Sequence, residues 1–268
     1  MNKLTNMLRV AALPLEIKWA DKDANFAGVS HAMANLPHGT DVVVLPELFS
    51  TGYADDAELM RDLAEKNTGQ TIDFVKALAS RYGVAIAGSF LASTHPHLYN
   101  RGFFIEPSGE ETYYDKRHLF SLSSEAAVFS AGSTHLPVIR FRGWNIAMIV
   151  CYDLRFPVWC RCRDNSYDLL LVVANWPQAR GYAFEHLLIA RAIENQCCVV
   201  GANRGGSDIY GLYDGLTQIY DGRGMPVGEI KGDFVVADLS REKQDSYRRN
   251  FPVSNDADDF TILDKFHR

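Results

Sequence analysis

Three residues whose side chains can carry out acyl transfer stand beside apolar runs of this sequence. Cys151 ends the run IAMIV, Glu47 follows the run VVVLP, and Lys116 lies in the polar stretch YYDKRHLF. A cysteine at the end of a buried strand can be aimed into a cleft, where backbone N–H groups of the following turn stabilise negative charge. A thiol is mostly protonated at neutral pH, so nucleophilic use requires a base or a cation beside it. A partly desolvated carboxylate at Glu47 has the chemistry of a proton-transfer group.

Each of these residues also has an ordinary structural explanation. Free cysteines are often buried and pack like small apolar side chains. Glu47 is equally well explained as a solvated loop residue, and Lys116 as a surface lysine. Of the histidines, His118 in DKRHLF stays open as a partner for the thiol. Taken one at a time, the three residues do not decide between packing and catalysis.

The elements that must position these residues are indicated by hydrophobic periodicity. Continuous apolar runs, which are typical of strands buried on both faces, occur at 42–48, 84–90, 145–150, 169–176 and 197–204. Helical spacing occurs at 21–36, 71–82 and 182–196. Gly83 has the position of a helix C-terminal stop. The alternation predicts an α/β layered fold in which helices cover the sheets.

Composition limits the class of partner. The chain has 268 residues and a formal charge of −6, from 27 basic and 33 acidic residues. We expect no nucleic-acid surface and no membrane patch, and a small-molecule substrate instead. Pro14 and Glu16 interrupt the N-terminal apolar patch, so we expect neither a signal peptide nor a membrane span, and a cytoplasmic location. Five cysteines without C-x-x-C spacing fit a reducing compartment and predict no metal site.

Taken together and in order, the motifs resemble those of the carbon–nitrogen hydrolase (nitrilase) superfamily. VVVLPELFSTGY, YYDKRHLFS and CYDLRFPVW provide Glu, Lys and Cys in that order, and LLLVVANWPQAR, LLIARAIENQ and GANRGG also match, so the resemblance covers about residues 9 to 240. The segments KRHLF, CYDLRFP and ANWP are most similar to the omega-amidase branch, which cleaves the distal amide of alpha-keto acid amides. The resemblance implies a four-layer α-β-β-α sandwich. We expect a single domain over residues 1–268, with 241–268 as a C-terminal extension.

The resemblance also implies roles for individual residues. It makes Cys151 the nucleophile, Glu47 the general base and then acid, and Lys116 the group that stabilises the oxyanion. Glu125 is the only acidic residue between the lysine and cysteine motifs, so it is the candidate for a second glutamate that orients the substrate or the lysine; the alternative is an exposed glutamate on a helical turn. The backbone N–H of Tyr152 would also hold the developing negative charge. No cofactor is needed.

A keto-acid amide carries a carboxylate, for which an arginine near the pocket is expected. Arg180, just past ANWPQ, is the first choice, whereas Arg155 together with Pro157 is expected to fix the loop after the nucleophile. The remaining candidates for lining the pocket are Asn175, Trp176, Tyr53 and Phe49.

The sequence therefore predicts a thiol amidase that hydrolyses 2-oxoglutaramate or 2-oxosuccinamate through a thioester and releases ammonia. The alternatives are another hydrolase of the superfamily, such as a carbamoylase or nitrilase, and a catalytically silent interaction or redox-sensing protein. The resemblance implies a homodimer or higher homo-oligomer. The polar segment from Arg241 is expected to lie on the surface or to meet a partner subunit.

Overall fold

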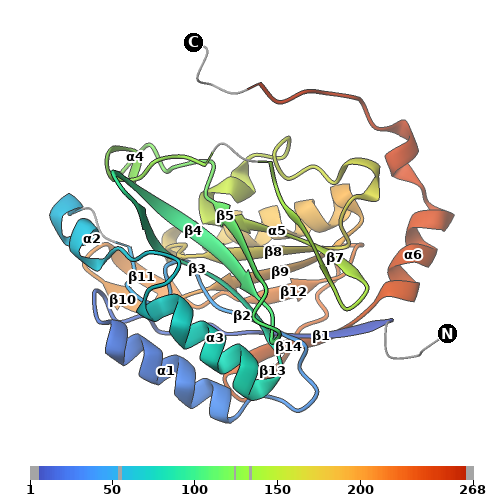
Figure 1. Ribbon diagram of the computed structural model, residues 1–268. Coiled ribbons are helices and arrows are strands. Elements are labelled where there is room, and N and C mark those ends of the chain that lie inside the picture. Colours follow the sequence, from blue (N-terminus) through green and yellow to red (C-terminus); the bar gives the residue numbers. More distant parts are fainter. Residues whose placement is uncertain (1–5, 54–55, 124, 133–134, 264–268) are drawn as a thin grey trace.

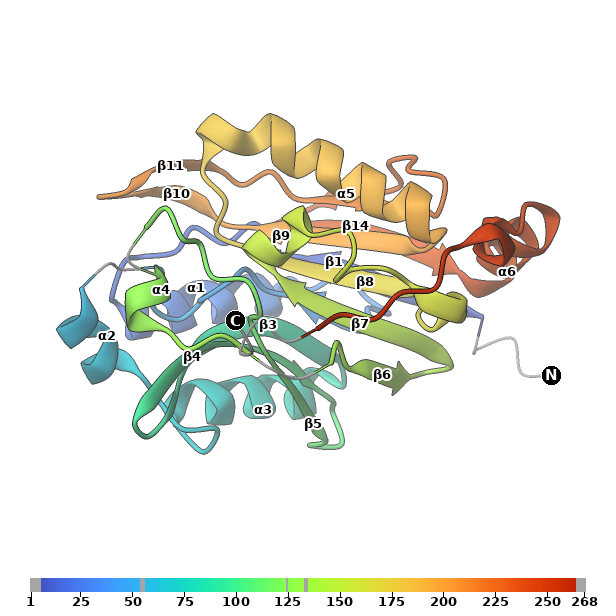
Figure 2. The same ribbon diagram turned by 90° about the horizontal axis from the view of Figure 1, so that it is seen from above.

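In the described residues, two large β-sheets lie face to face and helices cover their outer faces (Figures 1 and 2). The computed structural model describes residues 6–53, 56–123, 125–132 and 135–263. In Figure 2, α5 (Gly181–Asn195) lies above one sheet, and α1 (Lys22–Ala34) and α3 (Gln70–Tyr82) lie below the other. This is the four-layer sandwich that the sequence predicts.

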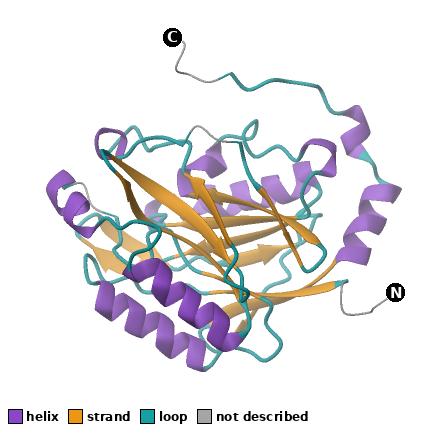
Figure 3. Ribbon diagram, viewed as in Figure 1, coloured by secondary structure: helices purple, strands orange, loops and turns teal. Residues whose placement is uncertain are grey.

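Each sheet has parallel strands at its centre and antiparallel strands at its edges (Figure 3). The described strands of the larger sheet follow the order β13 (Glu229–Lys231), β14 (Phe234–Ser240), β1 (Met7–Ala12), β2 (Val42–Val44), β3 (Ala85–Thr94), β4 (His97–Ile105) and β5 (Glu111–Asp115). Those of the smaller sheet follow the order β12 (Gln218–Tyr220), β9 (Cys198–Asn203), β8 (Leu169–Ala174), β7 (Trp144–Val150) and β6 (Val138–Phe141). A separate hairpin consists of β10 (Gly205–Asp208) and β11 (Gly211–Asp214).

Shorter helices lie around this sandwich. They are α2 (Ala57–Leu63), α4 (Glu125–Val128), α6 (Arg241–Asn250) and the 3₁₀ helices η2 (Cys151–Arg155), η3 (Arg163–Asn165), η4 (Gln178–Arg180) and η5 (Val253–Asp256). Over the described ranges, the helices are too short or too polar to span a bilayer.

The core between the sheets explains why the apolar runs are continuous. Every residue of β2, β8 and β9 is buried, because one face of these strands meets the other sheet and the opposite face meets helices. On the outer face of the smaller sheet, α5 contributes Phe184, Leu188 and Ala192 to the core. Burying a Val, Leu or Ile side chain contributes about 1.5–3 kcal/mol, so these layers hold the strand ends firmly in place.

The five predicted strands and the three predicted helices are confirmed, with ends shifted by a few residues. Gly83 has the left-handed conformation (φ 67°) that ends α3. The first run ends as a strand at Val44, before Pro46, which has no N–H to donate to a neighbouring strand. Glu47 therefore lies in a loop just beyond β2.

The C-terminal helix α6 lies at the outer edge of the molecule, as expected for a polar segment (Figure 1). Two of its polar side chains are nevertheless buried, Gln244 and Arg248. The Arg248 guanidinium donates to Asp168 Oδ1 at 3.0 Å and to the Tyr167 carbonyl at 2.7 Å. This helix is therefore attached to the sandwich mainly by hydrogen bonds of charged side chains and not by apolar contacts.

Candidate active site

The ends of strands from both sheets meet at one place. Glu47 follows β2 and Lys116 follows β5 in the larger sheet, while Cys151 follows β7 in the smaller sheet. The Glu47 N–H donates to the carbonyl of Ala174, the last residue of β8, at 3.4 Å. The two sheets are therefore joined by the backbone next to the predicted catalytic residues.

Lys116 lies between two carboxylates. Its Nζ donates to Glu47 Oε1 at 2.9 Å and to Glu125 Oε1 at 2.7 Å, and the three side chains are at most 4% exposed. Glu125 Oε2 also accepts the backbone N–H of Phe120 at 2.6 Å. Lys116 is therefore not a surface lysine, and Glu125 is not an exposed glutamate.

Glu47 is held at both oxygens. Oε1 accepts a second hydrogen bond, from Asn100 Nδ2 at 2.7 Å, and Oε2 accepts the backbone N–H of Asn175 at 2.8 Å. The Asn100 amide is itself oriented, because its Oδ1 accepts from Ser89 Oγ, which in turn accepts the N–H of Leu48. Sequence reasoning missed Asn100. The available signal was an asparagine within a strand-like stretch, where this residue type is disfavoured.

Cys151 is the first residue of η2 and has a left-handed backbone (φ 46°), which is uncommon for a residue other than glycine. Its thiol lines the same cavity as Glu47, Lys116 and Asn175, and it is close enough to Glu47 and Lys116 for their charges to act on it. Burial and the negative charge of Glu47 raise the pKa of this thiol, while Lys116 opposes the shift. The thiol is therefore protonated at rest, with a carboxylate beside it that can accept the proton.

The charges around Lys116 determine its state. Burial alone would lower the pKa of Lys116, but the carboxylates of Glu125 and Glu47 outweigh it and raise the pKa well above its ordinary value. Lys116 is therefore a permanent ammonium group. Burial raises the pKa of Glu125, and Lys116 only partly offsets this.

Hydrogen bonds of Asp153 fix the turn after Cys151. Asp153 Oδ2 accepts the Tyr114 hydroxyl at 2.8 Å and the Val150 N–H at 3.1 Å, and Oδ1 contacts His118 Nδ1 at 2.8 Å. His118 is thus paired with Asp153 and does not line the cavity at Cys151. Sequence reasoning did not identify Asp153, and the expected role of Arg155 and Pro157 in this loop stays a prediction.

Cys151 opens into a cavity of about 670 Å³. Its walls include the other sequence candidates, namely Tyr53, Tyr152, Asn175, Trp176 and Arg180. Phe49 does not line it, because its ring is fully buried in the core beneath the larger sheet. Arg155 does line it, with its guanidinium 4.7 Å from the centre of the Trp176 ring.

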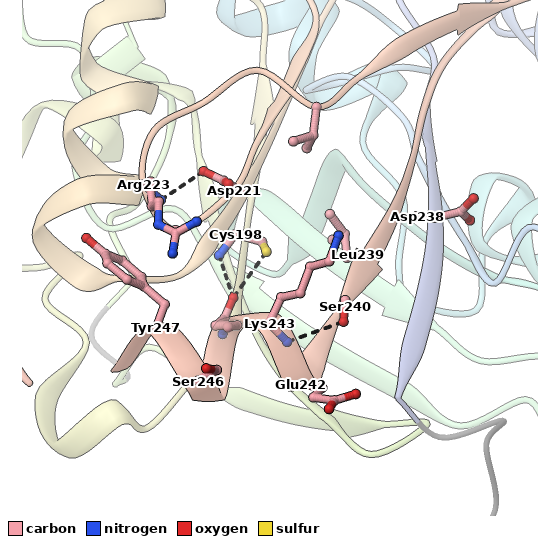
Figure 4. Close-up of a pocket in the computed structure, with 13 residues that line it drawn as sticks. Cys198, Asp221, Arg223, Asp238, Leu239, Ser240, Glu242, Lys243, Ser246 and Tyr247 are labelled. Carbon is pink, nitrogen blue, oxygen red and sulfur yellow. Dashed lines mark hydrogen bonds between the residues drawn. The ribbon is translucent and has the colours of Figure 1, made fainter. Parts of the chain in front are cut away.

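The other cysteines lie in different surroundings. Cys198 borders a separate cavity of about 720 Å³ beside α6, where its Sγ and its backbone N–H both contact Gln244 Oε1 at 3.1 Å (Figure 4). Burial raises the pKa of Cys198 and of Cys160 to about 12. Neither thiol has the Glu–Lys arrangement that accompanies Cys151. The described residues contain no cluster of three or more His, Cys, Asp or Glu side chains that could hold a metal ion.

Comparison with known proteins agrees with this geometry. The model of the carbon-nitrogen hydrolase family matches residues 9–248. The chain therefore belongs to the carbon–nitrogen hydrolase family and is an enzyme of that class.

Its similarity is to the omega-amidase branch. It is 38% identical over 263 residues to omega-amidase YafV of Escherichia coli strain K12, covering 95% of this chain and 98% of the relative. It is 31% identical to the 2-oxoglutaramate amidase of Bacillus subtilis, covering 92% and 96%. These matches confirm the superfamily, the branch and the amidase class that the motifs indicated.

Solved structures share the fold. A CN-hydrolase superfamily protein of Xanthomonas campestris, described with an arsenic adduct in its active site, has a TM-score of 0.91 at 37% identity, covering 96% of this chain and 99% of the other. An amidase of Nesterenkonia AN1 has a TM-score of 0.80 at 24% identity, covering 94% and 98%.

Proposed function

We propose that the protein is an omega-amidase that hydrolyses the distal amide of 2-oxoglutaramate or 2-oxosuccinamate through a Cys151 thioester. The observation that carries the proposal is the buried Glu47–Lys116–Glu125 chain of hydrogen bonds beside the Cys151 thiol. The names of the relatives support the substrate class.

In the first half-reaction, Cys151 Sγ attacks the amide carbon while Glu47 takes the thiol proton. The carbonyl oxygen becomes an oxyanion, stabilised by the Lys116 ammonium and by the Tyr152 N–H, which at the start of a helix has no partner within that helix. When the intermediate collapses, the C–N bond breaks, Glu47 returns the proton to nitrogen, and ammonia leaves.

In the second half-reaction, water attacks the thioester carbon and Glu47 takes a proton from the water. The C–S bond then breaks, the proton returns to sulfur, and the dicarboxylate is released. Glu125 does not touch the reacting atoms on this assignment. Together with Glu47 it fixes the position of the Lys116 ammonium, so that the ammonium points at the oxyanion.

The distribution of charge supports a substrate with an amide at one end and a carboxylate at the other. The floor of the cavity holds one ammonium and two carboxylates. The walls hold the guanidinium groups of Arg155 and Arg180, which stack on Trp176 and Phe120 and have no hydrogen-bond partner among the described residues. A substrate carboxylate is repelled by the floor and attracted by the walls, so the distal amide is the group presented to Cys151.

The proposal is tested by measuring ammonia release from 2-oxoglutaramate, 2-oxosuccinamate, an N-carbamoyl amine and an aliphatic nitrile. We expect turnover of the two keto-acid amides, loss of at least about 10³-fold in kcat for Cys151→Ala, and stoichiometric labelling of Cys151 by limiting iodoacetamide. Turnover of the carbamoyl amine or nitrile alone would show a different hydrolase of the family. Full activity of Cys151→Ala, or no activity on any substrate together with labelling elsewhere, would favour the silent or redox-sensing alternative.

We further propose that the chain forms a homodimer or larger homo-oligomer and works in the cytoplasm. Tyr182 and Ile193 on the outer side of α5 are 78% and 49% exposed, and Met225 in a neighbouring loop is 58% exposed. Apolar side chains grouped in this way are typical of surfaces that associate. The five free thiols are in keeping with a reducing compartment. Light scattering during size-exclusion chromatography measures the mass directly, and a mass of 30.0 kDa would refute self-association.

A further inference from the structure

The hydroxyl of Tyr213 lies in the active-site cavity without a role in the arrangement described so far. Tyr213 is 4% exposed and lines the same cavity as Cys151. Its hydroxyl has no hydrogen-bond partner among the described residues, yet it is not one of the completely enclosed polar atoms, so it borders the cavity. A hydroxyl that borders the cavity and is not bonded to a described residue is available to donate to a bound substrate.

The backbone holds Tyr213 beside the reacting groups. The residue belongs to β11, whose partner strand β10 starts directly after Arg204. The Arg204 N–H donates to the Ala174 carbonyl at 3.2 Å, and this is the same carbonyl that accepts the N–H of Glu47. The base of the hairpin is therefore bonded to the strand end that also fixes the general base.

A buried cation orients the ring and acts on its hydroxyl. The Arg204 guanidinium lies 4.2 Å from the centre of the Tyr213 ring, and it pairs at 2.5 Å with Asp208, both side chains being fully buried. Burial, with the negative charges of Asp208 and Glu47, raises the pKa of Tyr213, so the phenol stays protonated. Arg204 opposes this shift, because its positive charge favours the ionised phenolate. Tyr213 is therefore a neutral hydroxyl that can donate a hydrogen bond.

The polar groups assigned so far leave one part of the substrate without a partner. Lys116 and the Tyr152 N–H serve the oxyanion, Glu47 serves the leaving nitrogen, and the arginines of the walls serve the carboxylate. The oxygen of the 2-oxo group is an uncharged acceptor between the amide and the carboxylate. We propose that the Tyr213 hydroxyl donates a hydrogen bond to this oxygen and thereby selects 2-oxo acid amides over amides that lack it. This inference rests on the proposed omega-amidase function.

The test combines a variant with a substrate analogue. Tyr213→Phe removes only the hydroxyl, and glutaramate is 2-oxoglutaramate with a methylene group in place of the 2-oxo group. We expect Tyr213→Phe to lower kcat/KM for 2-oxoglutaramate about ten-fold, the value of one hydrogen bond, and to change kcat/KM for glutaramate by less than about two-fold. The matched control is Tyr82→Phe, at a half-buried tyrosine at the end of α3 that does not line the cavity, which should change neither value. Because the Tyr213 hydroxyl has no partner among the described residues, Tm should stay within about 2 °C of the wild type.

The outcomes separate this inference from the proposed function. An equal loss on both substrates would mean that Tyr213 acts on the reacting amide or on the fold, and no loss on either would mean that it contacts no substrate; each result overturns the inference while the amidase function stands. A wild-type enzyme that hydrolyses neither keto-acid amide refutes the proposed function, and the inference with it.

Discussion

Replacing Asn100 by aspartate tests whether the base at Cys151 depends on the amide that holds it. The substitution keeps the shape of the side chain and exchanges a donor for a second carboxylate. That carboxylate would replace Nδ2, which is 2.7 Å from Glu47 Oε1. Asn100 is fully buried, so solvent does not screen the new charge.

The size of the effect follows from Coulomb's law. Two unit charges about 4 Å apart repel by about 4 kcal/mol at an effective dielectric constant of about 20. This repulsion raises the pH at which the carboxylate pair loses its shared proton by about three units. The attraction of the nearby Lys116 ammonium reduces this rise to about two units. The two carboxylates of Asn100→Asp should therefore keep a shared proton to higher pH, and a protonated Glu47 cannot accept the thiol proton.

The measurement is kcat/KM for 2-oxoglutaramate between pH 5 and pH 10. Added negative charge favours the protonated form, so the acid limb of the profile moves to higher pH by about two units, and at pH values below both limbs the activity is about 100-fold lower than that of the wild type. Activity should recover as the pH rises. Asn35→Asp, at an exposed residue at the end of α1, adds the same charge and should leave the profile unchanged. A profile for Asn100→Asp that coincides with the wild type would refute the assignment of Glu47 as the base, and a uniform loss at every pH would point to a damaged fold.

Further expected outcomes concern the lysine and the C-terminal helix. Glu125→Gln removes one of the two carboxylates that fix the Lys116 ammonium, so kcat should fall about 10–100-fold while Tm changes little; an unchanged kcat would contradict the positioning role. Because the pKa of Glu125 is raised, protonation should produce the same loss in the wild type as the pH falls, and this part of the acid limb should be absent from the variant. Asp168→Asn leaves the buried Arg248 without its carboxylate and should cost about 3–5 kcal/mol of unfolding free energy, seen as a Tm lower by about 10 °C with kcat/KM at 25 °C unchanged.

The parts of the fold that the sequence predicts well are those that one local pattern decides. The runs that became β7, β8 and β9 are apolar at nearly every position, and this pattern arises only where both faces of a strand are covered. Helix α3 has apolar periodicity and a glycine at its end. The catalytic candidates follow such strands, so their order in the chain could be recognised before any distance was known.

Residues in weak patterns were missed because their role depends on contacts between distant segments. Asn100 pairs with Leu91 in the middle of β4 and β3, and its function comes from Glu47, 53 positions earlier in the chain. Tyr213 lies in the glycine-rich segment GGSDIYGLYDG, which has no strand periodicity. Phe49 was placed in the pocket because a loop gives no alternation from which to infer which side chains point inward.

The charges on the floor and on the walls of the cavity should also distinguish a keto acid from an amino acid. Glutamine has the same distal amide and carboxylate as 2-oxoglutaramate, but it has an ammonium group where the keto acid has an oxygen. On our assignments that position lies beside the Tyr213 hydroxyl, and the guanidinium groups of Arg155 and Arg180 would repel an ammonium there. Attraction to the carboxylates of the floor would draw the ammonium towards Cys151 and turn the amide away from it. The same charges that orient a keto-acid amide for attack therefore orient glutamine unproductively, which lets the enzyme act on the product of a transamination without consuming the amino acid itself.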